Sequence, residues 1–270
     1  MRLGLSFAGA DPAGLSRKRM ISDAQLVESA GFSSQWFFDA IGRGVMLPDP
    51  LIAVCEAAGA TQHIEVGTCI MQVPLRRPAE LAHRVMTAQL MTESRMLFGV
   101  GAGSTKVDFD LLDLDFDSRM AAFEEGLRIM RTLWRGEAIN GVSIAPWAST
   151  LGGPPVLIGS WSGKVWIPKA AREFDGWIAS GAKSTFNALS QGIEVFRSAG
   201  GKRAIVTNIQ YDLDAPTTEM PDDGPFHLRC QPDEAKRRIE RLIGLGYDDA
   251  VFVVPDRSAA RLDGLRKLVG

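Results

Sequence analysis

The chain has few of the side chains that build metal sites or acid–base dyads. Of its 270 residues three are histidines and three are cysteines, and the cysteines lie far apart with no metal-binding spacing. The sequence contains no Ser–His–Asp set and no His-Glu-x-x-His motif. We therefore predict no metal site, assign no catalytic residue, and expect reduced thiols in the cytoplasm.

Long apolar runs and an excess of one charge are also missing. No apolar segment approaches the roughly 20 residues that a membrane span needs, and the apolar part of residues 1–14 is too short for a signal peptide. The 30 basic residues nearly balance the 32 acidic ones. Neither nucleic acid nor a membrane is therefore expected as a partner.

One helix-to-strand junction occurs three times. A helix end is followed by a glycine or an acid, an aromatic residue, small polar residues and a buried strand, at residues 28–38, 172–179 and 243–253. Gly31 and Gly246 fit the position just after a helix, where a left-handed backbone costs glycine little. Repetition of this junction indicates a repeating α/β architecture.

Eight buried segments are predicted to be strands, and most precede a helical segment. They are residues 2–7, 35–38, 64–73, 97–101, 155–159, 177–180, 203–213 and 249–254. The clearest helix covers residues 118–135. This alternation of strands and helices predicts that residues 1–270 form a single α/β domain, a (β/α)8 TIM barrel. Residues 106–117, 140–154 and 212–224 are predicted to be irregular loops.

The segment from Ile64 to Ser104 predicts one complete βαβ unit. After the first strand, Arg76 and Arg77 lie on a proline-bracketed turn. A helix then follows, with one apolar face predicted from the spacing of Leu81, Val85, Met86 and Leu90. Small-molecule chemistry sits at the carboxyl ends of the strands in such units. The residues expected there are Thr68, Cys69, Gln72, Gly101, Gly103 and Ser104.

Glycines alternate in the segment Gly99–Ser104, which admits three interpretations. A dinucleotide fingerprint requires the spacing Gly-x-Gly-x-x-Gly with a helix directly after it. Here Gly99, Gly101 and Gly103 alternate, and an acidic loop follows. The glycines otherwise either let the strand end pack closely or let bare backbone amides approach an anionic or planar ligand. Similarly, the segment Gly159–Lys164 is either a phosphate-binding turn before a helix or an ordinary turn.

Two single residues also have two interpretations each. Asp39 follows an aromatic strand, and either accepts hydrogen bonds from a ligand in the barrel mouth or caps the next turn. Lys183 follows the sixth strand, and is either a Schiff-base lysine or a solvated surface lysine.

Five segments in order carry a resemblance to a known family. They are residues 30–39, 64–70 with 77–82, 92–103, 119–136 and 154–177. Together they resemble the bacterial luciferase-like family of flavin- and deazaflavin-dependent oxidoreductases, over essentially the whole chain. The resemblance implies a luciferase-like (β/α)8 barrel that binds FMN or the deazaflavin coenzyme F-420 at its carboxyl face. It also implies a homodimer.

The resemblance assigns cofactor-binding residues position by position. Asp39 lies near the cofactor. Thr68, Cys69 and Ile70 match a bulge that backs the ring, with a cis peptide expected at Cys69–Ile70. The positions that match the lining of the flavin tail and phosphate are Gly101, Gly103, Gly159, Ser160, Ser162 and Gly163. The basic residues expected near the mouth are Arg76, Arg77, Lys106 and Lys164.

Two departures from the family pattern bear on catalysis. Ala40 stands where many members have a histidine, and Ser94 stands where a glycine is expected. The expected function is hydride transfer with the deazaflavin, or oxygenation with FMN, on a small organic substrate. The alternatives are a non-catalytic flavin-binding barrel, motivated by Ala40, and a cofactor-free lyase or isomerase that uses Lys183.

Overall fold

The strands form one closed parallel barrel. The computed structural model describes residues 1–7, 14–161, 163–255 and 257–269. Its strands are β1 (Arg2–Phe7), β2 (Ser34–Phe37), β3 (Glu65–Thr68), β4 (Met71–Gln72), β5 (Met96–Gly101), β6 (Val156–Gly159), β7 (Gly176–Ser180), β8 (Arg203–Asp212), β9 (His227–Arg229) and β10 (Asp249–Val254). The order around the sheet is β10-β1-β2-β3-β5-β6-β7-β8, and pairing of β10 with β8 closes it. The predicted eight-stranded barrel is confirmed.

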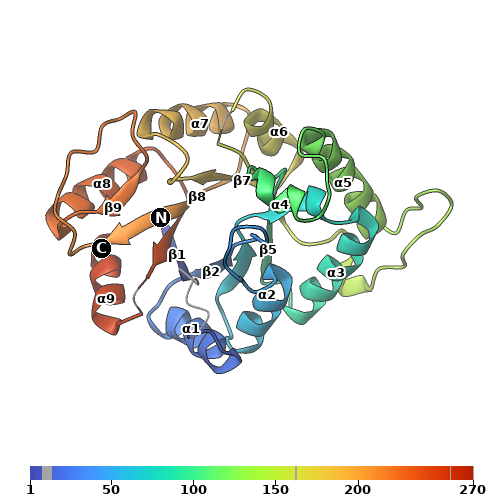
Figure 1. Ribbon diagram of the computed structural model, residues 1–270, viewed down its shortest axis with the longest axis horizontal. Coiled ribbons are helices and arrows are strands. Elements are labelled where there is room, and N and C mark those ends of the chain that lie inside the picture. Colours follow the sequence, from blue (N-terminus) through green and yellow to red (C-terminus); the bar gives the residue numbers. More distant parts are fainter. Residues whose placement is uncertain (8–13, 162, 256, 270) are drawn as a thin grey trace.

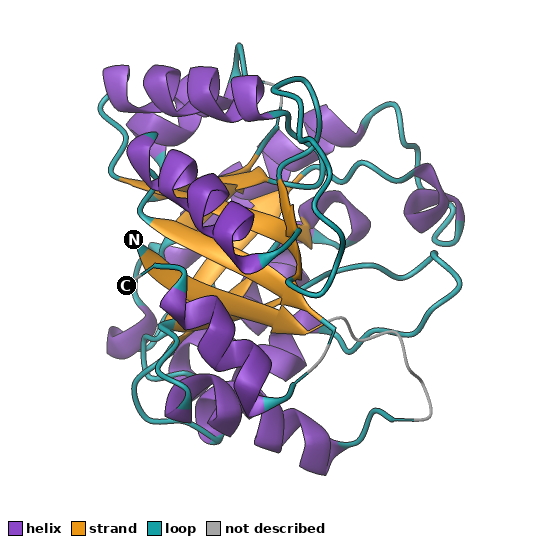
Figure 2. Cartoon of the chain, turned by 90° about the vertical axis from the view of Figure 1, so that its left-hand side faces the viewer, coloured by secondary structure: helices purple, strands orange, loops and turns teal. Residues whose placement is uncertain are grey.

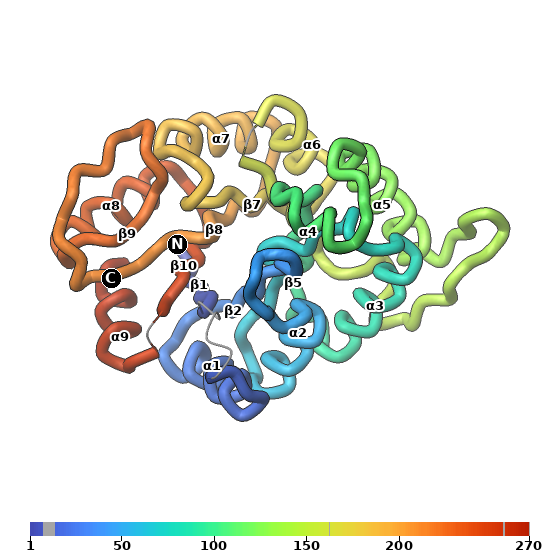
Figure 3. Tube along the Cα trace, in the orientation of Figure 1, coloured from blue at the N-terminus to red at the C-terminus, as the bar shows by residue number. Residues whose placement is uncertain are grey.

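Helices surround the barrel, as Figure 1 shows from one end and Figure 2 from the side. They are α1 (Arg17–Ser29), α2 (Pro50–Gly59), α3 (Pro78–Met91), α4 (Lys106–Asp110), α5 (Arg119–Trp134), α6 (Trp166–Glu173), α7 (Phe186–Ser198), α8 (Pro232–Gly244) and α9 (Ala259–Lys267). No helix in the described part of the chain is long and apolar enough to cross a membrane. After α5 the chain makes an excursion away from the barrel (Figure 3).

The core has two layers because successive strand residues face opposite sides of the sheet. One layer lies between the strands and the helices. The other fills the barrel interior, and its buried members are Trp36, Cys69, Leu97, Leu157, Ile178, Ile205 and Val251. Gly67 makes room for the Trp36 indole, because a Cβ there would lie 2.5 Å from its ring.

Charged side chains close the end of the barrel where the strands begin. Arg203 donates to Glu65 at 2.9 and 2.5 Å and to Asp249 at 3.1 and 3.0 Å. Arg2 adds a bond of 3.0 Å to Asp249, whose side chain is 1% exposed. We call these four residues the amino-end network.

Several predicted boundaries were wrong. Residues 64–73 do not form one strand, because β3 ends at Thr68, β4 begins at Met71, and Val73 starts a 3-10 turn. The expected cis peptide at Cys69–Ile70 lies in this gap and is confirmed. Residues 106–117 are not wholly irregular, since they include α4. The short strand β9 was not predicted.

The predicted apolar face of α3 was right at three positions and wrong at one. Leu81, Val85 and Met86 are buried, whereas Leu90 is 43% exposed. The helical repeat explains the error, because nine residues correspond to about two and a half turns. Leu90 therefore lies on the side opposite Leu81.

Candidate functional site

A cavity of about 700 Å³ opens at the carboxyl ends of the strands. A volume of this size is typical of small-molecule sites. Nearly every strand of the barrel contributes to its wall. The lining residues at or next to the strand ends are Phe38, Cys69, Ile70, Gly101, Gly159, Ser180 and Val253, and Asn208 contributes from within β8.

Most of the predicted cofactor-binding residues lie together in this cavity. Those that line it are Asp39, Cys69, Ile70, Gly101, Gly103, Gly159 and Ser160. Thr68 lies below the cavity, fully buried, where its hydroxyl donates to the Gly99 carbonyl at 2.7 Å. Gly163 lies next to Ile167 and is not among the residues that line the cavity. Ser162 lies outside the described residues.

Three glycines bring bare backbone to the cavity wall between β5 and β6, and we call them the glycine cradle. A Cβ at Gly101 would lie 2.5 Å from Ile70 Cδ1, and one at Gly159 would lie 2.7 Å from Ile70 Cγ2. Gly103 has a left-handed backbone with φ of 81°, and a Cβ there would lie 2.5 Å from Gln72 Oε1. Any larger residue at these positions would fill space against Ile70 or Gln72. The helix after the cradle, α4, begins only at Lys106, which argues against a dinucleotide fingerprint.

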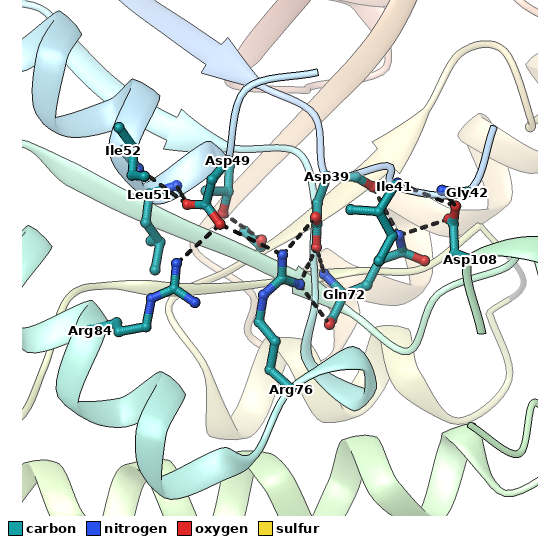
Figure 4. A network of polar contacts seen from close by, with 12 residues as sticks. Asp39, Ile41, Gly42, Asp49, Leu51, Ile52, Gln72, Arg76, Arg84 and Asp108 are labelled. Carbon is teal, nitrogen blue, oxygen red and sulfur yellow. Dashed lines mark hydrogen bonds and ion pairs between the residues drawn. The ribbon is translucent and has the colours of Figure 1, made fainter. Parts of the chain in front are cut away.

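The carboxylate of Asp39 is committed to Arg76. The two side chains form a bidentate pair at 2.6 and 2.9 Å, and the backbone N–H of Gln72 donates to the same carboxylate at 2.8 Å (Figure 4). Burial alone would lower the pKa of Arg76, but its bonds and charge pairing with Asp39 raise that pKa above its ordinary value. Asp39 therefore fixes the rim of the cavity, and its carboxylate bonds Arg76 and Gln72 and does not cap the turn that follows it.

The basic residues predicted near the mouth do not line the cavity. Arg76 forms an ion pair with Asp39, and Arg77 is exposed on the turn before α3. Lys106 pairs with Asp110 one turn further along α4, and Lys164 is exposed. The basic residues that do line it are Arg43, Arg119 and Lys183.

Asp108 is a residue that the sequence did not reveal. Its carboxylate is fully buried and accepts hydrogen bonds from the Gly42 amide at 2.9 Å and from Gln72 Nε2 at 2.9 Å. It also pairs with the Arg43 guanidinium at 2.7 and 3.1 Å. Burial would raise the pKa of Asp108, but these bonds hold it below its usual value. Asp108 thus ties the loop after β2, which lines the cavity through Arg43, to α4.

Gln72 joins the two carboxylates. Its Nε2 donates to the backbone carbonyl of Asp39 at 2.9 Å and to the Asp108 carboxylate. Its backbone N–H donates to the Asp39 carboxylate. We call Asp39, Gln72, Arg76, Asp108 and Arg43 the carboxyl-end network.

The remaining lining offers no evident acid–base pair. Burial raises the pKa of the Cys69 thiol, so this side chain is neutral and unreactive. The guanidinium of Arg119 stacks 3.8 Å from the Phe116 ring and donates to that residue's carbonyl. Lys183 is exposed, unlike the desolvated lysines that form Schiff bases. Among the described residues, no cluster of His, Cys, Asp and Glu could hold a metal.

The model of the luciferase-like monooxygenase family matches residues 4–263. The chain belongs to this family. Its relatives use different chemistry. Limonene 1,2-monooxygenase of Rhodococcus erythropolis is 30% identical over 44% of the chain, which corresponds to only 32% of that enzyme. F-420-dependent glucose-6-phosphate dehydrogenase of Mycolicibacterium fortuitum is 24% identical over 93% of the chain and 92% of its own length. The chain thus spans about a third of the first enzyme and nearly all of the second.

Solved structures of similar shape confirm the luciferase-like barrel. A monooxygenase from Streptomyces bottropensis superposes with a TM-score of 0.82 at 18% identity, over 99% of this chain and 97% of that one. The FMN complex of a type II Baeyer–Villiger monooxygenase from Pseudomonas putida gives 0.79 at 18% identity, over 100% and 97%. An F-420-dependent secondary alcohol dehydrogenase gives 0.76 at 17% identity, over 99% and 97%.

Proposed function

We propose that this luciferase-like barrel is an oxidoreductase that binds FMN or coenzyme F-420 in the cavity and acts on a small organic substrate. The observation that carries the proposal is the glycine cradle. Its three glycines line the cavity with bare backbone, which lets a flat ring and its tail approach closely. Gly101 and Gly159 also pack so closely on Ile70 that a side chain at either position would displace Ile70 from the cavity wall. The relatives support either cofactor, since their names include both FMN and F-420.

In this proposal Ile70 and Cys69 back the ring, Gly101, Gly103 and Gly159 flank it, and Ser160 lies toward the phosphate-bearing tail. The bound cofactor supplies hydride transfer, or oxygen activation if it is FMN. The protein orients the ring and keeps water away from it. Apolar lining residues serve the second task, and they are Phe38, Val45, Leu47, Met120, Phe123 and Trp166.

The two carboxylates near the proposed ring are each paired with an arginine. Asp39 is paired with Arg76, Asp108 is paired with Arg43, and the Cys69 thiol is neutral. With Ala40 in place of a histidine, the proposed reaction relies on the cofactor and not on a side-chain base at that point. The proposal also includes a single domain over residues 1–270, a cytoplasmic location, consistent with the three free cysteines, and a homodimer.

The deciding experiment is a titration of the purified protein with FMN and, separately, with F-420, followed by quenching of tryptophan fluorescence. We expect micromolar binding of one cofactor. Gly159→Val places methyl groups against Ile70 and should weaken that binding at least tenfold. Gly244→Val is the matched control, because nothing lies within 4 Å of a Cβ at this position at the end of α8.

Three outcomes have distinct meanings. Failure of both cofactors to bind contradicts the proposal. Equal binding by Gly159→Val and the parent shows that the ring lies elsewhere. Tight binding without turnover under any reductant identifies the non-catalytic flavin-binding barrel instead.

A further inference from the structure

The strand β8 carries an extra residue where it lines the cavity. Ile205 and Val206 pair in register with Asp249 and Ala250 of β10, but the next paired residue of β8 is Ile209, opposite Phe252. Thr207 and Asn208 therefore lie opposite the single residue Val251. A bulge of this kind re-aims a side chain and is common beside active sites.

The bulge turns a second side chain into the cavity. In a regular strand Thr207 and Asn208 would face opposite sides of the sheet, whereas here both line the cavity. Asn208 has a left-handed backbone with φ of 57°, which asparagine tolerates better than most residues. A non-glycine residue in this conformation inside a strand is an unusual feature that requires support from its surroundings.

Asn208 and Ser180 together form a neutral polar pair. Asn208 Nδ2 donates to Ser180 Oγ at a long distance of 3.4 Å, and Ser180 ends β7 directly opposite Thr207. This bond leaves the second N–H and the carbonyl oxygen of the Asn208 amide, and the hydrogen of the Ser180 hydroxyl, for another partner. No second protein partner of the Asn208 amide exists among the described residues. The pair is therefore available to a ligand.

The pair faces the proposed cofactor site across the barrel. The order of the closed sheet places β8 four strands from β3 in either direction. Asn208 thus lies on the wall opposite Cys69 and Ile70, and the cavity between them holds the substrate if the cofactor lies against Ile70. This step rests on the proposed function.

We propose that Asn208 and Ser180 bind an uncharged oxygen of the substrate, a carbonyl or a hydroxyl, and so set substrate specificity. The wall around the pair is neutral apart from Lys183, whose side chain is exposed at the rim. An amide and a hydroxyl match a neutral oxygen, whereas a buried anion requires charged partners. The rest of the substrate faces the apolar lining described above.

The test compares three ligands that share one ring: cyclohexanone, methylcyclohexane and cyclohexanecarboxylate. Their dissociation constants are measured by tryptophan fluorescence on protein saturated with whichever cofactor binds. We expect cyclohexanone to bind most tightly, although burial of apolar surface alone favours methylcyclohexane. Asn208→Gly, which keeps the left-handed backbone, should weaken cyclohexanone about fivefold to tenfold, the size of one neutral hydrogen bond.

Matched variants separate this effect from damage to the fold. Asn140 also has a left-handed backbone, with φ of 51°, but is exposed in the excursion after α5, so Asn140→Gly should change nothing. Asn208→Asp should weaken cyclohexanone because a carboxylate repels a carbonyl oxygen. Methylcyclohexane and cofactor binding should stay within about twofold in Asn208→Gly.

Two results overturn the inference. One is cyclohexanone binding that Asn208→Gly leaves unchanged or weakens only in parallel with methylcyclohexane. The other is preferred binding of cyclohexanecarboxylate that Lys183→Ala removes, which makes this wall an anion site. Either result leaves the cofactor titration intact, so failure here is distinct from failure of the proposed function.

Discussion

The two ends of the barrel use charged side chains in different ways. In the amino-end network, Arg2, Glu65, Arg203 and Asp249 all stand on strands, at or near their first residues. The charged members of the carboxyl-end network instead lie outside the strands: Asp39 and Arg43 follow β2, Arg76 precedes α3, and Asp108 is on α4.

The two networks differ because the carboxyl end of the barrel contains a cavity that must stay open. Charges on strands are held by the sheet and fill the end of the barrel, so they serve stability. Charges on loops shape the wall of the cavity without filling it. This division is typical of barrels of this type, in which the carboxyl face carries function. The comparison predicts that mutations at the two ends will separate stability from ligand binding.

The largest effect on stability is expected at Arg203. Arg203→Met leaves Glu65 and the buried Asp249 with only the half-exposed Arg2, and should lower the free energy of unfolding by about 3 kcal/mol. Urea unfolding measures this change. Arg2→Met is the control and should cost clearly less. Cofactor affinity should not change, and a clear loss of cofactor affinity in Arg203→Met would contradict the division between the two ends.

Asp108→Asn should cost less stability but disturb the cavity. The substitution removes the charge that holds Arg43 and the Gly42 amide, for a loss of about 1–2 kcal/mol. The loop after β2 should then open more often, which limited trypsin digestion detects as faster cleavage after Arg43. Asp110→Asn on the same helix is the control, because Asp110 pairs with Lys106 at the surface. Equal cleavage in both variants would show that Asp108 does not hold this loop.

The pH dependence of stability should reveal the same carboxylate. The pKa of Asp108 is below its ordinary value in the folded protein, so its contribution is complete above about pH 4 and is lost as the pH falls through the folded pKa. The difference in unfolding free energy between the parent and Asp108→Asn should therefore be constant from neutral pH to about pH 4, and shrink below it. A difference that grows on acidification would have the wrong sign.

Lys183→Ala should have the smallest effect. The side chain is exposed, so the free energy of unfolding should change by less than about 0.5 kcal/mol and the cofactor dissociation constant should stay the same. Fluorescence titration and urea unfolding check both values. Trapping of a substrate on the parent protein by borohydride, lost in Lys183→Ala, would instead support the lysine-based lyase.

Local patterns in the sequence were sufficient for the barrel. Buried runs such as 97–101 and 249–254 identify strands, because a strand covered on both faces must be apolar along its length. The glycines at positions 101, 103 and 159 were found as strand-end signals. The segments that carry the family resemblance are also local, which is why Cys69–Ile70 was located correctly.

What the sequence could not show are pairings between distant residues. Asp39 and Arg76 are 37 positions apart, and Asp108 lies 65 positions from Arg43. In the sequence Asp108 is one of five acids in residues 106–117, and only the packing of α4 on the loop after β2 distinguishes it.

The bulge at Asn208 was hidden for a related reason. Residues 203–213 are predicted from the sequence to be one strand, and the extra residue is defined only by the register of β8 with β10. The sequence by itself thus determined the order of strands and helices, since that depends on the burial pattern within each segment. Tertiary structure alone decided which polar groups reach the cavity, because their positions depend on contacts between elements far apart in the chain.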